Sequence, residues 1–133
     1  MREIKFRGKL VGNGEWVYGS LIGSNVIVGD IIEFTEEYFN CEYWWRVKPA
    51  TVGQYTGLKD RLGVEIYEGD KCSVTLSTGR KVYAFVSFVD GCFELQFVSL
   101  IEINGRYNDR DYLKCYTVNH AIEVIGNIYE TSN

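Results

Sequence analysis

Residues 53–70, GQYTGLKDRLGVEIYEGD, hold a dense mixture of glycines, carboxylates and hydroxyls, the residue types found in catalytic and ligand-binding loops. The stretch combines glycines, which let a backbone approach a ligand closely, with carboxylates and hydroxyls that can bind one. It has neither the GxxxxGK[ST] spacing of a phosphate-binding loop nor GxGxxG between a strand and a helix. Asp60 to Gly63 and Glu68 to Asp70 instead match tight turns, in which the aspartate accepts backbone hydrogen bonds and the glycine is left-handed. We therefore predict that most of this stretch turns the chain.

Three polar residues at the start of the stretch, Gln54, Tyr55 and Thr56, are not explained by turning alone. Their amide and hydroxyl groups could tie two β layers together or face a binding partner. Both interpretations stay open, and the three residues form one candidate partner-binding segment.

Nucleophilic catalysis would depend on His120, because it is the only histidine in the chain. Glu123 could orient its imidazole, and a cysteine would have to serve as nucleophile. We expect His120 to be an ordinary loop residue, so we predict no catalytic residue and no enzyme activity.

The cysteines also argue against a metal centre, since no two of them form a C-x-x-C pair. The four are Cys41, Cys72, Cys92 and Cys115. The last three lie in apolar runs, where a free cysteine is expected to pack as a small hydrophobic residue. No metal, cofactor or small-molecule substrate is therefore predicted.

A weaker candidate for a hard-cation site lies in the polar segment 104–116. Asn104, Asn108, Asp109 and Asp111 offer oxygen ligands, but their spacing is not that of an EF-hand. We expect these acids to be solvated in an irregular loop that contains one helical turn.

The aromatic run Tyr43-Trp44-Trp45 presents a second candidate partner-binding site. In a strand, alternate residues face opposite sides, so Trp44 and Arg46 share a face. That face could stack nucleic-acid bases, anchor a protein partner, or pack between the two halves of the chain. The formal net charge of -4 and pI near 5.0 favour a protein partner over a nucleic acid.

Composition favours a β protein that folds as one domain or two small ones. The 133 residues are 46% hydrophobic and 15% aromatic, with a single proline. The sequence has no signal peptide and no apolar run long enough to span a bilayer. These features predict a soluble protein with reduced thiols in the cytoplasm.

Alternating apolar residues and turn dipeptides predict the elements that position these candidates. Asn13-Gly14 and Asp90-Gly91 are typical of hairpins, and Cys72, Val74 and Leu76 are expected on one buried face. The basic cluster Arg2, Lys5, Arg7 and Lys9 is interpreted as a solvated strand edge rather than a phosphate-binding stripe. Residues 35–42 are interpreted as a single helical turn with Thr35 as its N-cap.

Pro49 cannot donate to a sheet ladder, so it marks the predicted boundary between an N-terminal β region, 1–50, and a C-terminal region, 51–133. Short strands about every ten residues with glycine turns predict an all-β fold with a small barrel. The order of turns and hairpins in 51–133 is similar to an SH3-like barrel, which we expect to pack with 1–50 as one compact unit.

The segments MREIKFRGK, EWVYGSLI, TVGQYTGLKDRLGVEIYEGD and EVIGNIYE together resemble the YopX-like proteins of phages and prophages, across essentially the whole chain. The family's central signature is typically QYTGLKDKNGxxIYEGD. This chain departs from it at Arg61 and Leu62, which replace Lys-Asn, and at Cys72, which replaces an aliphatic residue. The resemblance implies a mostly β fold with an SH3-like C-terminal part and a phage or prophage origin. It implies no biochemical activity.

The sequence therefore predicts a phage-type accessory protein in the host cytoplasm that acts as a non-catalytic binding module. Its partner is expected to be a protein or a second copy of the chain, since open edges of small sheets readily associate. The alternative is single-stranded nucleic-acid binding through the surface around Trp44 and Arg46. Membrane association is not expected.

Overall fold

The computed structural model describes residues 3–29 and 31–130. These residues form antiparallel strands with one short 3-10 turn and one short α-helix, which confirms the all-β class. The chain divides into two compact units, Met1–Tyr55 and Thr56–Asn133. The unit boundary falls within a strand, beyond the Pro49 boundary expected from sequence, and the packing of the two regions stays a prediction. Neither helix in the described part of the chain could cross a membrane.

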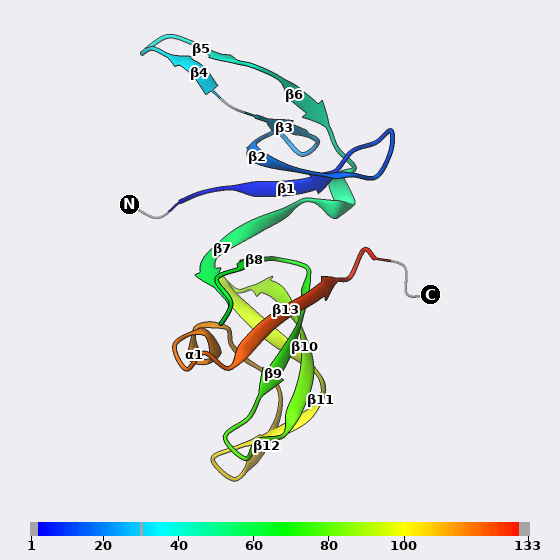
Figure 1. The fold of residues 1–133 in the computed structure, drawn as a ribbon, viewed down its shortest axis with the longest axis vertical. Helices are drawn as coiled ribbons and strands as arrows, with labels where there is room; N and C mark the ends of the chain where they lie inside the picture. Colours follow the sequence, from blue (N-terminus) through cyan, green and yellow to red (C-terminus); the bar gives the residue numbers. More distant parts are fainter. Residues whose placement is uncertain (1–2, 30, 131–133) are drawn as a thin grey trace. The chain divides into compact units, whose positions relative to one another are not determined.

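The first unit contains a sheet whose strands run in the order β6-β3-β2-β1-β7 (Figure 1). Its strands are β1 (Phe6–Lys9), β2 (Trp16–Ile22), β3 (Val26–Val28), β6 (Trp44–Arg46) and the beginning of β7 (Gly53–Lys59), with the 3-10 turn η1 (Pro49–Thr51) before β7. The predicted hairpin at Asn13-Gly14 is confirmed, because it joins β1 to β2 with Gly14 at φ 72°. Pro49 follows β6, where its missing N–H interrupts no ladder.

The core of the first unit is small. Val17, Ile27 and Val47 are its buried members, and half-buried side chains such as Trp45 pack around them. A bridge between Leu10 and Val47 returns the end of β6 to the end of β1. Few side chains are therefore available to hold this unit together.

The basic cluster does not lie on a strand edge as predicted. β1 is paired on both sides, with β2 and with β7, so Lys5, Arg7 and Lys9 belong to or adjoin an interior strand. Arg7 is buried, and its guanidinium carbon lies 4.6 Å from the centroid of the Trp16 ring. The prediction failed because alternation alone does not show how many neighbours a strand has. Arg2 lies outside the described residues.

A separate two-stranded hairpin interrupts the first unit between β3 and β6. It consists of β4 (Ile31–Phe34) and β5 (Phe39–Cys41), drawn in cyan in Figure 1. The helical turn predicted for 35–42 is wrong, because Thr35 organises a hairpin turn instead. Its hydroxyl oxygen accepts the backbone N–H groups of Glu37 and Tyr38 at 3.3 and 3.1 Å, while the Thr35 N–H donates to the Tyr38 carbonyl.

The second unit contains a sheet with the strand order β12-β11-β10-β9-β13. Its elements are the end of β7, β8 (Glu65–Tyr67), β9 (Asp70–Thr75), β10 (Lys81–Val89), β11 (Cys92–Ile103), β12 (Arg106–Tyr112), α1 (Lys114–Thr117) and β13 (Ile122–Asn127). Asp90-Gly91 forms the predicted hairpin, with φ values of 49° and 80°. Among the described residues β12 does not pair with β13, so this sheet is open and the expected barrel is not closed.

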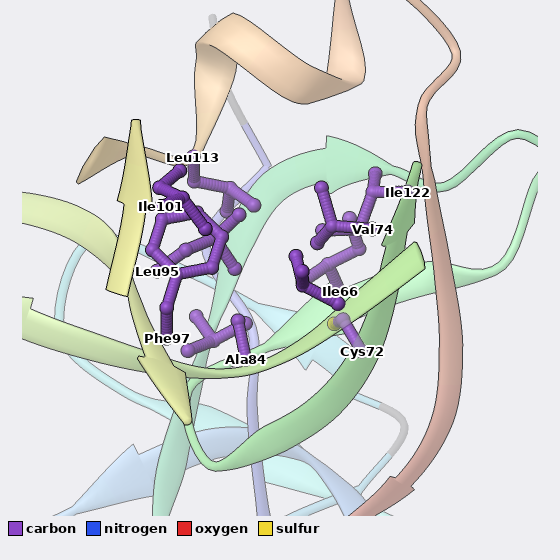
Figure 2. Packing of buried hydrophobic residues seen from close by; sticks show 11 residues of the cluster. Ile66, Cys72, Val74, Ala84, Leu95, Phe97, Ile101, Leu113 and Ile122 are labelled. Carbon is purple, nitrogen blue, oxygen red and sulfur yellow. The ribbon is translucent and has the colours of Figure 1, made fainter. Parts of the chain in front are cut away.

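The core of the second unit is larger than that of the first. Figure 2 shows Leu95, Phe97, Ile101 and Leu113 gathered on one side of this core and Ile66, Cys72, Val74 and Ile122 on the other. Cys72 and Val74 alternate inward along β9, as the sequence predicted. Burial at period two on several strands is the main stabilising feature of this unit.

Segment 104–116 differs from the predicted loop, although its helical turn is confirmed as α1. Residues 106–112 form strand β12, which pairs with β11. Its polar composition is that of an edge strand, where charged side chains protect the free edge from association.

Candidate functional site

The turn around Asp60 is built on one buried carboxylate. Oδ1 of Asp60 accepts the N–H groups of Leu62 at 2.8 Å and Val64 at 2.9 Å. Oδ2 accepts the N–H of Val124 at 2.9 Å, which is 64 positions away in the chain. The prediction that Asp60 accepts backbone hydrogen bonds is therefore confirmed, and the carboxylate is fully engaged in structure.

The same turn protects the outer edge of β13. The Arg61 N–H donates to the Ile122 carbonyl at 3.0 Å. The Arg61 guanidinium donates to the Glu123 carboxylate at 2.9 and 3.2 Å. Since β9 pairs with the other edge of β13, this closing strand is held from both sides.

The glycines of the stretch are required by backbone geometry. Gly63 has φ 84° and Gly69 has φ 92°, both in the left-handed region that the sequence predicted for Gly63. Asp70, which is also buried, accepts the Tyr67 N–H at 2.8 Å. Residues 60–70 thus turn the chain twice, and both of their aspartates accept hydrogen bonds from backbone N–H groups.

The segment Gln54 to Thr56 lies on β7 and has mixed surroundings. The Tyr55 ring is buried, with the Lys5 ammonium 5.4 Å from its centroid, and Gln54 is half-buried opposite Phe6. The Thr56 hydroxyl donates to the Ile66 carbonyl at 2.8 Å, which ties β7 to β8. A structural use is therefore evident for Thr56, and partner binding by the segment stays a prediction.

Trp44 and Arg46 do lie together on one face of β6. Both are exposed, and 57% of Trp44 is accessible to solvent. Trp45, between them, turns inward to the small core, and Tyr43 packs 4.7 Å from its ring centroid. The structure therefore brings this predicted pair together on the surface.

Further exposed aromatic side chains lie in the β4–β5 hairpin, which precedes Trp44 in the chain. We call residues 33–44 the aromatic arm. Its exposed large side chains are Phe34, Tyr38, Phe39, Tyr43 and Trp44. Phe34 and Phe39 are cross-strand neighbours, and Phe34 is 77% exposed. The sequence does not predict this surface, because the pattern of residues 35–42 also fits a helical turn with Thr35 as its N-cap.

The aromatic arm is also acidic. It contains four glutamates, Glu33, Glu36, Glu37 and Glu42, and no lysine, arginine or histidine. Glu33 accepts hydrogen bonds from the Tyr38 hydroxyl at 2.9 Å and the Asn40 amide at 3.0 Å, which rigidifies the hairpin. The other three carboxylates belong to exposed residues.

A second surface feature is an open groove of about 1000 Å³ in the second unit. We call it the polar groove. It lies among the β9–β10 turn (76–80), the β11–β12 turn (104–105) and residues 119–121 before β13. The half-buried side chains of Leu76, Ile103 and Tyr116 contribute apolar surface, and Arg80 and Lys81 are exposed at its edge.

His120 lines the polar groove, but the predicted orienting group is engaged elsewhere. Glu123 also lines the groove, but its carboxylate accepts hydrogen bonds from the Arg61 guanidinium. His120 has φ 53° and its N–H donates to the Thr117 carbonyl at 3.2 Å, so it ends the turn that follows α1. The backbone conformation of His120 therefore serves the turn between α1 and β13.

The cysteines differ from one another in burial. Cys72 is buried, whereas Cys92 and Cys115 are exposed, so the prediction that all three pack inside is wrong for two. Burial, with smaller contributions from the Asp70 and Asp60 carboxylates, raises the pKa of Cys72 to about 12. Its thiol is therefore protonated and unreactive in the folded protein.

The acids of β12 make contacts within the protein. Asp111 accepts the Tyr116 hydroxyl at 2.8 Å, and burial together with this bond raises the pKa of Tyr116. Asp109 pairs with Arg110 at 3.3 Å on the surface. Within residues 3–29 and 31–130 no cluster of His, Cys, Asp or Glu is arranged to hold a metal ion.

Comparison with known proteins identifies the family of this chain and a solved structure with a similar fold. A family model described as YopX protein matches residues 5–133. Among solved structures, the crystal structure of protein EF1440 from Enterococcus faecalis is similar, with a TM-score of 0.62 and 22% identity. That similarity covers 97% of this chain and 95% of the Enterococcus chain, and at this identity it supports the fold alone. A search of curated proteins finds no match.

Proposed function

The chain belongs to the YopX protein family, and from this premise we propose that it is a non-catalytic binding module whose aromatic arm docks on a partner protein. The resemblance noted in the sequence supports a phage or prophage accessory role in the cytoplasm of a bacterial host. The observation that carries the binding role is the exposure of the arm's aromatic side chains.

Exposed aromatic residues on one short hairpin are costly unless a partner covers them. Isolated two-stranded hairpins are marginally stable in water, and β4 and β5 form such a sheet. Docking would bury Phe34, Tyr38 and Phe39 and so supply the packing that the hairpin lacks. Aromatic side chains of this kind are enriched among the residues that contribute most to protein interfaces.

The charge of the arm favours one class of partner. The arm itself holds four glutamates and no cationic residue, so it should repel phosphate groups and attract basic side chains. We therefore propose a partner surface with an apolar centre and a rim of lysine and arginine.

The absence of catalysis is part of the proposal. Asp60 and Asp70 of the signature stretch accept hydrogen bonds from backbone N–H groups, and Glu123 forms an ion pair with Arg61. The Cys72 thiol is protonated and buried. These arrangements support binding rather than acid–base or nucleophilic chemistry.

Single-stranded nucleic-acid binding is a second candidate, supported by the shared exposed face of Trp44 and Arg46. A base could stack on the indole while the guanidinium contacts a phosphate. A mobility shift with oligonucleotides that weakens with salt and disappears in Trp44→Ala would support this function. No shift at low salt would eliminate it.

The partner-protein proposal is tested by affinity capture from host cells in which the prophage is induced. The bait is the full chain, compared with Phe34→Ser/Phe39→Ser in the arm and with Tyr107→Ser as a matched exposed aromatic outside it. Tyr107 is 72% exposed on β12. The captured protein is then identified, purified and titrated.

The arm variant is expected to bind at least about tenfold more weakly, whereas Tyr107→Ser binds as the wild type does. Added salt should weaken the wild-type complex, since its rim is proposed to be ionic. Equal affinity of the arm variant and the wild type would overturn the proposal.

A further inference from the structure

We propose that the polar groove of one copy binds the aromatic arm of a second copy of this chain. The inference rests on the proposed function, because it names the partner surface of the same arm. Three observations carry it: the size of the groove, its charge, and the unpaired edges of the arm.

The groove has room for the tip of a hairpin. Its volume of about 1000 Å³ lies at the upper end of the range of roughly 300–1,000 Å³ that is usual for small-ligand pockets. It is open to solvent and bordered by three turns, so a protruding turn can enter without displacing a strand. Leu76, Ile103 and Tyr116 offer apolar surface for Phe34 or Tyr38 of the arm.

The charges of the two surfaces are complementary. Arg80 and Lys81 are exposed in the groove lining and make no ion pair among the described residues, whereas Arg61 is neutralised by Glu123. Glu102 is the remaining carboxylate of the lining. Glu36 and Glu37 project from the turn of the arm, so they can reach the two free cations as the aromatic rings enter.

Polar groups of the groove match the backbone of the arm. Among the described residues β4 and β5 pair with each other and with no further strand, so each leaves one edge of N–H and C=O groups outside the sheet pairing. The lining supplies the hydroxyls of Ser77 and Thr78 and the amides of Asn104 and Asn119. These groups can satisfy the backbone of the hairpin when water is excluded.

The contact joins two different surfaces, so it is heterologous. Each copy offers one arm and one groove, and association continues into a chain or closes into a ring. The smallest such ring is a dimer in which each arm enters the groove of the other copy, so the mass measured by light scattering should rise with concentration to at least that of a dimer. It should fall when salt is added.

Charge reversal on each surface tests the contact. Glu36→Lys/Glu37→Lys reverses the arm and Arg80→Glu/Lys81→Glu reverses the groove. Each variant alone should associate at least about tenfold more weakly than the wild type, and the quadruple variant should associate again. Arg106→Glu/Arg110→Glu on β12 is the matched control and should leave association unchanged. All variants should keep the wild-type urea midpoint, since the changed residues are exposed.

If both single-surface variants associate more weakly than the wild type and the quadruple variant does not regain association, the arm-to-groove contact is overturned. A wild type that stays monomeric at protein concentrations up to about 1 mM would also overturn the contact, because its dissociation constant would then be above about 1 mM. If the wild type is monomeric and Phe34→Ser/Phe39→Ser still loses a captured host protein, only the present inference fails. If that variant loses neither association nor capture, the proposed function fails as well.

Discussion

The aromatic arm and the signature stretch, residues 53–70, are both acid-rich segments that contain a turn, yet their carboxylates are used differently. In the signature stretch, the buried Asp60 carboxylate accepts three backbone N–H groups. In the arm, Glu33 accepts only side-chain donors, and Glu36 and Glu37 are exposed. The comparison separates acids that complete the fold from acids that remain available to a partner.

The difference follows from what surrounds each turn. The Asp60 turn lies against β13, whose free N–H at Val124 needs an acceptor when it is removed from water. In the part of the chain that the structure describes, no third strand pairs with the β4–β5 hairpin of the arm, and Glu36 and Glu37 are exposed. A dense group of acids is therefore informative about function only after the backbone donors around it have been assigned.

The largest expected effect comes from removing the Asp60 carboxylate. Asp60→Ala leaves the N–H groups of Leu62, Val64 and Val124 without their acceptor, so the free energy of unfolding should fall by about 3 kcal/mol or more. Asp60→Asn retains one acceptor oxygen and should lose less. Urea denaturation measures both.

A matched control for this change is Asp109→Ala. The Asp109 side chain is 65% exposed and pairs with Arg110 on the surface. Its loss should change stability by less than about 0.5 kcal/mol. Equal costs at Asp60 and Asp109 would remove the distinction between structural and available acids.

Gly63→Val tests the left-handed turn of the signature stretch. Gly63 has φ 84° and open space around a built Cβ, so the cost is backbone strain alone, about 1–2 kcal/mol or more. Gly12→Ala, which also adds a Cβ in open space but lacks the positive φ, should leave stability nearly unchanged. Equal urea midpoints for wild type and Gly63→Val would show that the turn tolerates any residue.

Alkaline pH should destabilise the second unit through Cys72. Burial raises the pKa of its thiol from 9.0 to about 12, so above pH 9 the unfolded chain releases a proton that the folded chain retains. Stability is therefore lost as pH rises from 9 to 12, by up to about 1.4 kcal/mol per pH unit. The free energy of unfolding of the wild type, relative to that of Cys72→Ala, should fall by about 1 kcal/mol between about pH 8 and about pH 10. If the difference in free energy of unfolding between the two proteins does not change with pH, the raised pKa of Cys72 is contradicted.

The smallest effect on stability is expected in the arm. Phe34→Ser removes a side chain that is 77% exposed, so the free energy of unfolding measured in urea should change by less than about 0.5 kcal/mol while partner binding weakens. A loss of more than about 1 kcal/mol would mean that the arm belongs to the core of its unit. The two segments would then differ less than proposed.

Local features of the fold were predictable from neighbouring residues. Asp90-Gly91, Asn13-Gly14 and the Asp60 to Gly63 turn act over a few positions, so residue type alone indicates their geometry. That Trp44 and Arg46 share one face followed from strand alternation in the same way, whereas the exposure of that face did not. The aromatic arm was missed because Thr35 can cap either a helix or a hairpin turn, and the choice depends on pairing between Phe34 and Phe39.

The sequence by itself determined the all-β class, the turns of the signature stretch and the inward face of β9, because these depend on period-two burial and on local backbone geometry. Tertiary structure alone decided that Asp60 holds Val124, that β1 is an interior strand, and that three distant turns border one groove. These features join residues far apart in the chain, and no local preference specifies which strands become neighbours. Asp60 and Asp70 of the signature stretch therefore stabilise the fold, whereas Glu36 and Glu37 of the arm are exposed to solvent.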